Sequence, residues 1–202
     1  SENVADLLMD SFHSKTRNMV RKGQKAGFVC SCTGEERAMR SLYKLHGENM
    51  KNLGGAAKSW EVFESIMKNF EYNIDYRVYV ASRNGEIISA LLLFYYNKIA
   101  EYFIPATVEA YKPEQPLSCL IMQAMRDAVV EKGCSMWNWG GTWKTQKGVY
   151  RFKKRWGASD RPYRYYISEN MEYGSLRHCN PTELSKMYKY FYTLPYSVLD
   201  TD

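Results

Sequence analysis

The residues best suited to chemistry lie between positions 137 and 158, where tryptophans, paired glycines and lysines follow one another closely. This segment begins Trp-Asn-Trp-Gly-Gly-Thr-Trp and ends Gly-Val-Tyr-Arg-Phe-Lys-Lys-Arg-Trp-Gly-Ala. A strand that ends in Gly140 and Gly141 lets the backbone approach a ligand closely, because neither residue has a Cβ. A lysine beside aromatic residues, as Lys153 is beside Phe152, can stabilise a developing oxyanion or a phosphate there. Spacing alone fits an ordinary exposed lysine equally well.

Basic residues gather at two places, although the net charge of the whole chain is only +6. Between 144 and 164 there are eight basic residues and one acid, and helical spacing places Lys147, Arg151 and Lys154 on approximately one face. The second group contains no acid and consists of Lys15, Arg17, Arg21, Lys22 and Lys25. Such focused charge predicts an anionic partner: a phosphate, a nucleotide or an RNA backbone. A solvated basic helix face is the alternative for the 144–164 group.

The elements that must position these residues follow from the periodicity of the apolar side chains. Helical spacing predicts helices over 16–26, 35–50, 59–70, 116–132, 146–156 and 182–192. Alternation and turn residues predict strands over 28–32, 76–82, 86–96, 99–107, 135–139 and 164–168. Asn84-Gly85 and Asn97-Lys98 mark tight turns, so the three strands from 76 to 107 form an antiparallel meander. The order is a mixed α/β pattern in which the helix over 116–132 crosses between neighbouring strands.

Length and composition bound the classes of protein that the chain can belong to. Its 202 residues, 45% of them hydrophobic, suffice for one domain over 1–175 with a helical extension over 176–202. The longest apolar run, 87–96, is about half of what a membrane helix needs, so no membrane span is expected. The chain begins at Ser1 without a signal-peptide pattern, which fits a piece of a longer protein.

Cysteine and histidine usage predicts the compartment and argues against a metal site. The five cysteines lack metal-ligand spacing and the three histidines are scattered, so we expect no metal. Cys30 and Cys32 share one face of the predicted strand over 28–32, because side chains alternate along a strand. Free, buried thiols indicate a reducing compartment, and we expect a cytoplasmic protein.

The segment from Trp137 to Ala158 resembles the signature of the FemABX family of transferases. That signature is a strand ending F-x-x-G-G/R-S/T, a variable loop, and then G-x-x-x-F-K-x-x-W/F-G-A. The run from Arg17 to Gly27, Arg-Asn-Met-Val-Arg-Lys-Gly-Gln-Lys-Ala-Gly, resembles the helix R-N-x-I-R-K-A-x-K-x-G at the start of the family's second domain. Leu194-Pro195 resembles a C-terminal feature of related sequences, so the likeness covers roughly 15–195.

The resemblance implies the acetyltransferase-like (GNAT) fold, with a central, mostly antiparallel sheet flanked by helices. It implies an enzyme, an N-acyltransferase that moves an aminoacyl group from a charged tRNA to an amine on a peptidoglycan precursor. Lys153, with Phe152, would lie at the reacting ester, and Tyr102 would bind the acceptor. Donor and acceptor contacts would come from Gly140, Gly141, Thr142, Lys147, Arg151, Arg17 and Arg21. The acceptor amine would attack the ester directly, without a covalent enzyme intermediate.

The sequence departs from the family pattern in two ways. A full first domain is absent, so a second GNAT-like domain or a partner copy would complete the cleft. Near Lys51-Asn52, where related transferases carry an arginine, there is none in register. The acceptor is therefore left open between a peptide, a nucleotide-sugar peptide and a small molecule.

Two other functions remain open from the sequence. An acyl-CoA enzyme of this fold would cradle the pyrophosphate with Q/R-x-x-G-x-G/A before the helix over 116–132. The chain has Glu-Ala-Tyr-Lys-Pro-Glu-Gln-Pro over 109–116, without glycine and with two prolines that lack N–H donors. Acyl-CoA is therefore the less favoured donor, aminoacyl-tRNA the favoured one, and no tightly bound cofactor is expected. The other function is a non-catalytic module that binds RNA or another polyanion. Glu101 or Glu109 could accept the amine proton.

Overall fold

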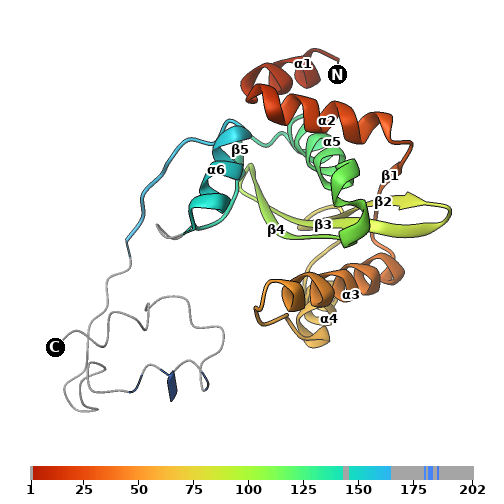
Figure 1. Ribbon diagram of the computed structural model, residues 1–202, viewed down its shortest axis with the longest axis vertical. Helices are drawn as coiled ribbons and strands as arrows, with labels where there is room; N and C mark the ends of the chain where they lie inside the picture. Colours follow the sequence, from red (N-terminus) through yellow and green to blue (C-terminus); the bar gives the residue numbers. More distant parts are fainter. Residues whose placement is uncertain (1, 143–145, 165–179, 181, 184–185, 187–202) are drawn as a thin grey trace. The chain divides into compact units, whose positions relative to one another are not determined.

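The computed structural model describes residues 2–142, 146–164, 180, 182–183 and 186, shown in colour in Figure 1. They belong to two compact units, Ser1–Ser159 and Asp160–Asp202. In the second unit the Asn180 side chain accepts hydrogen bonds from the backbone N–H groups of Thr182 and Glu183, as at a helix start. The predicted boundary between 175 and 176, the predicted strand over 164–168 except Arg164, and most of the helix over 182–192 lie outside the described residues.

The first unit contains one mixed five-stranded sheet. Its strands are β1 (Val29–Thr33), β2 (Tyr76–Arg83), β3 (Glu86–Tyr96), β4 (Ile99–Thr107) and β5 (Met136–Asn138). The strands follow one another in the order of the chain, and all neighbours are antiparallel except the parallel pair β4 and β5. The predicted mixed α/β fold with a mostly antiparallel sheet is confirmed.

Helices cover both faces of the sheet, with α2 and α5 on one face and α3 and α4 on the other (Figure 1). The helices are α1 (Glu2–Ser11), α2 (Ser14–Lys25), α3 (Glu36–Asn52), α4 (Trp60–Asn69), α5 (Pro116–Val130) and α6 (Lys147–Arg155), and η1 (Glu109–Glu114) is a short 3-10 helix. Every helix and strand predicted between 16 and 156 is present. The sequence did not predict α1 and η1.

The two predicted tight turns are present and have the backbone that their residues favour. Asn84 and Gly85 have φ of 53° and 79°, and Asn97 and Lys98 have φ of 46° and 60°. Two consecutive positive φ values are typical of the type I′ turn, whose twist matches that of the flanking strands. These turns fix the register in which β2, β3 and β4 pair, and β4 carries residues of the candidate site.

The apolar strand β3 is central, as its composition predicts. Its buried side chains alternate between the two faces, with Leu91 and Leu93 packing towards α5 and Leu92 packing towards α3 and α4. Val62 and Phe70, which the helical pattern places on the core side, are partly exposed, at 37% and 45%. Both lie on α4 or at its end, where only one narrow stripe of the helix meets the sheet.

Gly23 lets two helices cross closely. It is buried in the interior of α2, where a Cβ would lie 2.4 Å from the carbonyl oxygen of Gln115 and 3.2 Å from the Cβ of Cys119. Real side chains do not tolerate such a distance to backbone, so α2 could not pack on the start of α5 with any other residue here. The packing explains a glycine that helix propensity alone disfavours.

Candidate active site

Lys153 is bound to the turn that follows β5. Its Nζ atom donates hydrogen bonds to the carbonyl oxygens of Gly140 at 3.0 Å and Gly141 at 2.9 Å, and to Thr142 Oγ1 at 2.7 Å. Gly140 has φ of 69°, a conformation that glycine adopts without strain. The structure thus brings together four of the residues that the FemABX signature marks, and α6 presents the lysine to the paired glycines.

A hydrogen-bonded chain extends this turn back into the sheet. The N–H of Gly140 donates to Asn138 Oδ1 at 2.9 Å, and the Asn138 amide nitrogen donates to the carboxylate of Glu101 on β4. Burial raises the pKa of Glu101, and the Asn138 hydrogen bond and the Lys153 charge oppose that shift. Burial also lowers the pKa of Lys153, and the Glu101 charge opposes it. The two groups therefore stabilise each other's ionised forms.

Asn138 is a residue of the site that the sequence does not predict. Its only signal is its place as the polar residue between Trp137 and Trp139, which alternation exposes at the end of a strand. Glu101 was considered as a proton acceptor, and the parallel register that pairs it with Asn138 explains their contact.

Five aromatic rings pack behind the turn and hold α6 in place. The ring centroid of Trp139 lies 4.9 Å from that of Tyr102, 5.7 Å from that of Phe152 and 5.9 Å from that of Trp156. Trp137 completes the group at 5.6 Å from Trp139. Edge-to-face contacts of this kind stabilise a fixed ring arrangement. Because Phe152 and Trp156 anchor one face of α6, its neighbouring face carries Lys153 to the glycine turn.

Tyr102 belongs to this aromatic group and lies outside the cleft. Burial raises the pKa of its phenol, so the hydroxyl stays neutral at ordinary pH. The residues that line the cleft include Phe103, the next residue on β4, but not Tyr102. Its acceptor-binding role stays a prediction, and the structure gives it a packing role.

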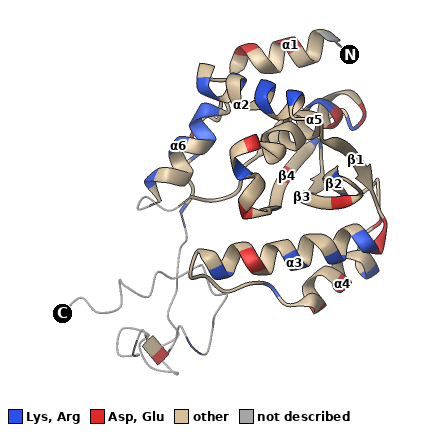
Figure 2. Cartoon of the chain, turned by 45° about the vertical axis from the view of Figure 1, so that its right-hand side comes forward, with Lys and Arg blue, Asp and Glu red and all other residues tan. Residues whose placement is uncertain are grey.

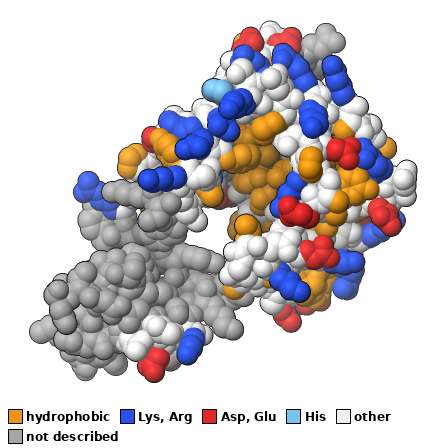
Figure 3. Space-filling model, viewed as in Figure 1, with side chains coloured by type: hydrophobic (Ala, Val, Ile, Leu, Met, Phe, Trp, Pro, Cys, Tyr) orange, Lys and Arg blue, Asp and Glu red, His pale blue; other side chains and the backbone are white. Residues whose placement is uncertain are grey.

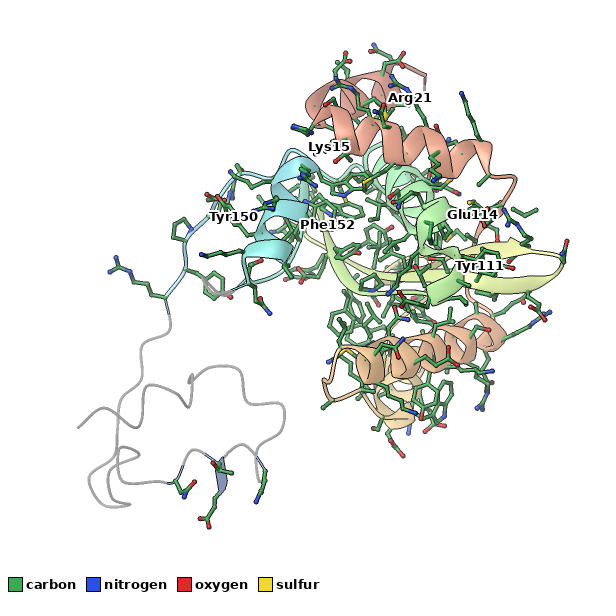
Figure 4. All side chains as sticks on the ribbon, viewed as in Figure 1. Lys15, Arg21, Tyr111, Glu114, Tyr150 and Phe152 are labelled. Carbon is green, nitrogen blue, oxygen red and sulfur yellow. The ribbon has the colours of Figure 1, made fainter. Side chains whose placement is uncertain are left out.

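A cleft of about 520 Å³ opens where β4 and β5 diverge. Their pairing ends at Glu101 and Asn138, whereas β4 continues to Thr107. The cleft is lined by the second half of β4, Met19 in the middle of α2, the end of α3, the start of α5, and Phe152. Figure 3 shows hydrophobic side chains gathered in the hollow between α2, α5 and α6, and Figure 4 shows Phe152 on the side of α6 that faces it. None of the described residues that line the cleft is acidic, and Lys58 and Lys112 supply positive charge.

The His46 side chain in the cleft wall is already engaged. Its Nε2 accepts a hydrogen bond from the backbone N–H of Lys58 at 3.2 Å. Burial and the nearby lysine charge lower its pKa. His46 is therefore a neutral hydrogen-bond acceptor that fixes the loop between α3 and α4. The electron pair on its Nε2 is used in this hydrogen bond, so it is not available as a base.

The side-chain amide of Asn49 occupies part of the open edge of β4. Asn49 Nδ2 donates to the carbonyl oxygen of Thr107 at 2.8 Å, and Asn49 Oδ1 accepts from the Thr107 N–H at 3.2 Å. Two residues earlier on the same edge, Pro105 has no N–H to offer. An extended ligand arm that paired with this edge would meet few free backbone partners.

The segment before α5 is held in place by hydrogen bonds of the Gln115 side chain. Gln115 has φ of 64°, its side-chain nitrogen donates to the carbonyl oxygen of Lys112 at 3.0 Å, and its side-chain oxygen accepts from Ser118 Oγ at 3.0 Å. Pro116 is the first residue of α5. The glycine-rich cradle of the acyl-CoA pattern is absent from this segment, as the sequence indicates.

The two basic segments meet. The N–H of His13, just before α2, donates to the carbonyl oxygen of Arg155 at 2.9 Å, and the rings of Phe12 and Trp156 lie 4.9 Å apart. Figure 2 shows the lysines and arginines of α2 and α6, and Lys147, Arg151 and Arg21 among them are exposed. Arg17 has a structural contact instead, because its Nη1 donates to the carbonyl oxygen of Phe12 at 2.6 Å.

Comparison with known proteins places this geometry in a family. Residues 10–154 match the model of the acetyltransferase (GNAT) domain. The chain belongs to this family of acyltransferases. No curated protein sequence is significantly similar to the chain. The predicted GNAT fold is therefore confirmed, and the narrower FemABX assignment stays a prediction.

Solved structures show the same fold at low sequence identity. FemX superposes with a TM-score of 0.70 at 16% identity, over 76% of this chain and 56% of the FemX chain. The aminoglycoside acetyltransferase meta-AAC0020 from an uncultured soil metagenomic sample gives 0.52 at 15% identity, over 71% of this GNAT chain and 97% of its own. The ribosomal-protein-alanine N-acetyltransferase from Brucella melitensis biovar Abortus 2308 gives 0.53 at 9% identity, over 71% and 100%. This GNAT chain thus spans little more than half the length of FemX.

Within the described part of the chain, no helix is long and apolar enough to cross a bilayer. The same residues contain no group of three or more histidine, cysteine, aspartate or glutamate side chains arranged to hold a metal ion.

Proposed function

We propose that this GNAT chain is a FemABX-type N-acyltransferase, which transfers an aminoacyl or acyl group from an activated ester to an amine. The observation that carries the proposal is the ammonium group of Lys153, held at the carbonyl oxygens of Gly140 and Gly141. The adjacent Phe152 lines the cleft. The Phe-Lys pair therefore joins the glycine turn to the cleft wall, which is where a reacting ester would be fixed.

Lys153 would act on the tetrahedral intermediate. All three N–H bonds of its ammonium group already have an oxygen partner. A developing oxyanion is a stronger acceptor than a carbonyl or hydroxyl oxygen, so it can replace one of the three. The hydrogen bond from Lys153 is therefore stronger in the transition state than in the ground state, which is the condition for rate acceleration.

The reaction balances without a covalent enzyme intermediate. The nitrogen of the neutral amine attacks the ester carbonyl carbon, a C–N bond forms, and the carbonyl oxygen becomes the oxyanion. The oxyanion then collapses, the ester C–O bond breaks, and the leaving alkoxide takes the proton that the amine nitrogen gives up. The Glu101 carboxylate already accepts a hydrogen bond from Asn138, so we assign this proton to the substrate or water.

The cleft supports an amine acceptor in its neutral form. It is largely apolar, none of its described lining residues is acidic, and Lys58 repels an ammonium ion, whereas Lys112 is paired with Glu109. Burial among apolar and cationic groups lowers the pKa of an amine, and the neutral amine is the nucleophile. A volume of about 520 Å³ fits the side chain and neighbouring groups of a peptide or a nucleotide-linked peptide.

Two observations favour an aminoacyl-tRNA donor. The basic helices α2 and α6 meet where His13 and Arg155 are joined by a backbone hydrogen bond. Lysine and arginine clusters of this kind bind phosphate backbones. The cradle for a CoA pyrophosphate is missing before α5, and Asn49 occupies the β4 edge beside which an acyl arm would lie.

Acyl-CoA is the alternative donor, since acyl-CoA is a substrate of GNAT acetyltransferases. The first turn of α5 still lines the cleft, and helix N-termini favour phosphate. A non-catalytic module that binds RNA through the α2 and α6 surface is a third candidate.

A donor test separates the three. The purified chain is incubated with a labelled aminoacyl-tRNA mixture or with labelled acetyl-CoA, each with a panel of peptide amines, and products are identified by mass. Amide formation from aminoacyl-tRNA supports the proposal, and formation from acetyl-CoA alone replaces it with the acyl-CoA alternative. Salt-sensitive tRNA binding without any amide product indicates the RNA-binding module.

A further inference from the structure

Two thiols lie in contact on the side of the first unit away from Lys153. Cys30 on β1 and Cys119 on α5 are 89 positions apart in sequence, and their Sγ atoms are 3.5 Å apart. Both side chains are partly exposed. β1 is the first strand in the sheet order and pairs only with β2 among the described strands, so a small reagent can reach the pair from the sheet edge.

The two sulfurs are chemically unequal. The Cys30 thiol donates its S–H to Cys119 Sγ. This hydrogen bond lowers the pKa of Cys119 and, together with burial, raises the pKa of Cys30. Cys119 is the fourth residue of α5, within the first turn, where the partial positive charge of the helix N-terminus also favours a thiolate. Cys119 is therefore the nucleophile and Cys30 its proton-bearing partner.

We propose that Cys30 and Cys119 form a reversible oxidative modification site, at which a peroxide converts the thiol pair to a disulfide. The Cys119 thiolate attacks one peroxide oxygen, so that an S–O bond forms, the O–O bond breaks and hydroxide leaves. Cys30 then attacks the sulfur of the resulting sulfenic acid, an S–S bond forms and a second hydroxide leaves. The two thiol protons convert both hydroxides to water, and hydrogen peroxide accepts the two electrons.

Little movement separates the thiol pair from the disulfide. A disulfide brings its sulfurs to about 2 Å, so the two atoms need to approach by about 1.5 Å. Gly23 limits how α5 can adjust, since a Cβ there would already be 3.2 Å from the Cβ of Cys119. The approach therefore comes from side-chain rotation and from β1, the strand at the sheet edge.

The disulfide would stiffen one wall of the cleft. It ties the edge strand β1 to the first turn of α5, and Pro116, Leu117 and Ser118 of that turn line the cleft. A bond that closes a long loop also restricts the unfolded chain, so oxidation raises the melting temperature. This modification does not rest on the proposed acyl transfer and is measured without any substrate.

The other described cysteines serve as internal controls. Cys32 Sγ lies 3.5 Å from the hydroxyl of Tyr72, and burial raises its pKa. Cys134 is buried, and burial raises its pKa as well. Neither has a thiol partner among the described residues. Cys179 lies outside the described residues and is replaced by serine in all test proteins.

The test treats the folded Cys179→Ser protein with hydrogen peroxide, quenches it, alkylates the remaining thiols and maps them by mass spectrometry. We expect Cys30 and Cys119 to resist alkylation, joined in one disulfide-linked peptide pair, and dithiothreitol to release them. Because Cys30 and Cys32 share a tryptic peptide, the Cys32→Ser variant must form the same bond, and so must Cys134→Ser. In Cys30→Ser a dimedone adduct should appear at Cys119.

Two results would overturn the proposal. One is a Cys179→Ser chain that keeps Cys30 and Cys119 fully alkylatable after peroxide treatment, with unchanged circular dichroism as evidence of folding. The other is a disulfide that forms between Cys30 and Cys32 in the Cys119→Ser variant. A dimedone adduct in Cys119→Ser on Cys30, with none on Cys119 in Cys30→Ser, would contradict the assigned nucleophile.

Discussion

Lys153 Nζ lies 2.9 Å from the carbonyl oxygen of Gly141, so an ammonium group on α6 holds the turn that ends β5. The contact connects two parts of the signature that a variable loop separates in sequence. It also means that the lysine has a structural role and the proposed catalytic role at once. Experiments on Lys153 must separate the two.

Glu101 gives a way to shift the charge of Lys153 without touching it. The ammonium form stabilises the oxyanion, exists below the Lys153 pKa and is lost as pH rises through it. The Glu101 charge raises that pKa against the lowering effect of burial. The Glu101→Gln variant removes the charge and keeps an oxygen that can accept from Asn138. The alkaline decline of transfer should therefore move to lower pH in a rate profile.

The matched control for this profile is Glu64→Gln, which removes an exposed carboxylate from α4, on the other face of the sheet. Its alkaline decline should coincide with that of the unchanged chain. A Glu101→Gln profile that stays in place, or moves to higher pH, would show that the ionised Lys153 does not limit the rate.

Gly23 and Gly47 should respond to alanine with opposite signs. Alanine at Gly23 meets the carbonyl oxygen of Gln115 at 2.4 Å, and such overpacking costs about 1–3 kcal/mol of unfolding free energy. At Gly47, inside α3, a Cβ meets nothing within 4 Å, so alanine should gain about 0.5–1 kcal/mol. Urea unfolding of both variants measures the difference. Equal effects would contradict the close crossing of α2 and α5.

The basic residues of α6 should make the affinity for tRNA depend on salt concentration. The double variant Lys147→Gln with Arg151→Gln removes two exposed charges from α6. If both contact phosphates, the slope of log affinity for tRNA against log salt should become shallower by about 1.4 to 1.8. The control pair, Lys44→Gln with Lys68→Gln, lies on α3 and α4, which pack on the other face of the sheet. Equal changes of slope in the two double variants would indicate non-specific attraction of tRNA to the whole chain.

The sequence predicts the elements well and their closest contacts poorly. Asn84-Gly85 and the apolar run of β3 determine local geometry by themselves, so the meander follows from neighbours in the chain. The role of Gly23 depends on Gln115, which lies far away in sequence, and no periodicity reveals it. Helix α1 was missed although Ala5, Leu8 and Met9 share one face that packs against the core, because the exposed Leu7 blurs that face in the sequence.

The residues of the candidate site, too, are predicted from the sequence only in part. The FemABX signature predicts that Lys153 and the paired glycines belong together, and the structure places them in contact. It does not predict Asn138, which joins the turn to Glu101, or Asn49, which covers the edge of β4. The first contact arises from the parallel register of β4 and β5, and the second from the edge that β4 leaves open beyond Glu101, and a linear pattern encodes neither.

The most direct test of the central claim compares Lys153→Met with Lys154→Met in single-turnover transfer from aminoacyl-tRNA to a peptide amine. Both variants lose one positive charge from α6, but only Lys153 contacts the turn. We predict that Lys153→Met lowers the rate at least 100-fold, in line with the loss of an oxyanion donor. Its melting temperature should stay nearly unchanged, because Gly140 and Gly141 are exposed and their carbonyl oxygens can bind water instead. Lys154→Met should keep most of the activity. Full activity in a folded Lys153→Met chain would contradict the account.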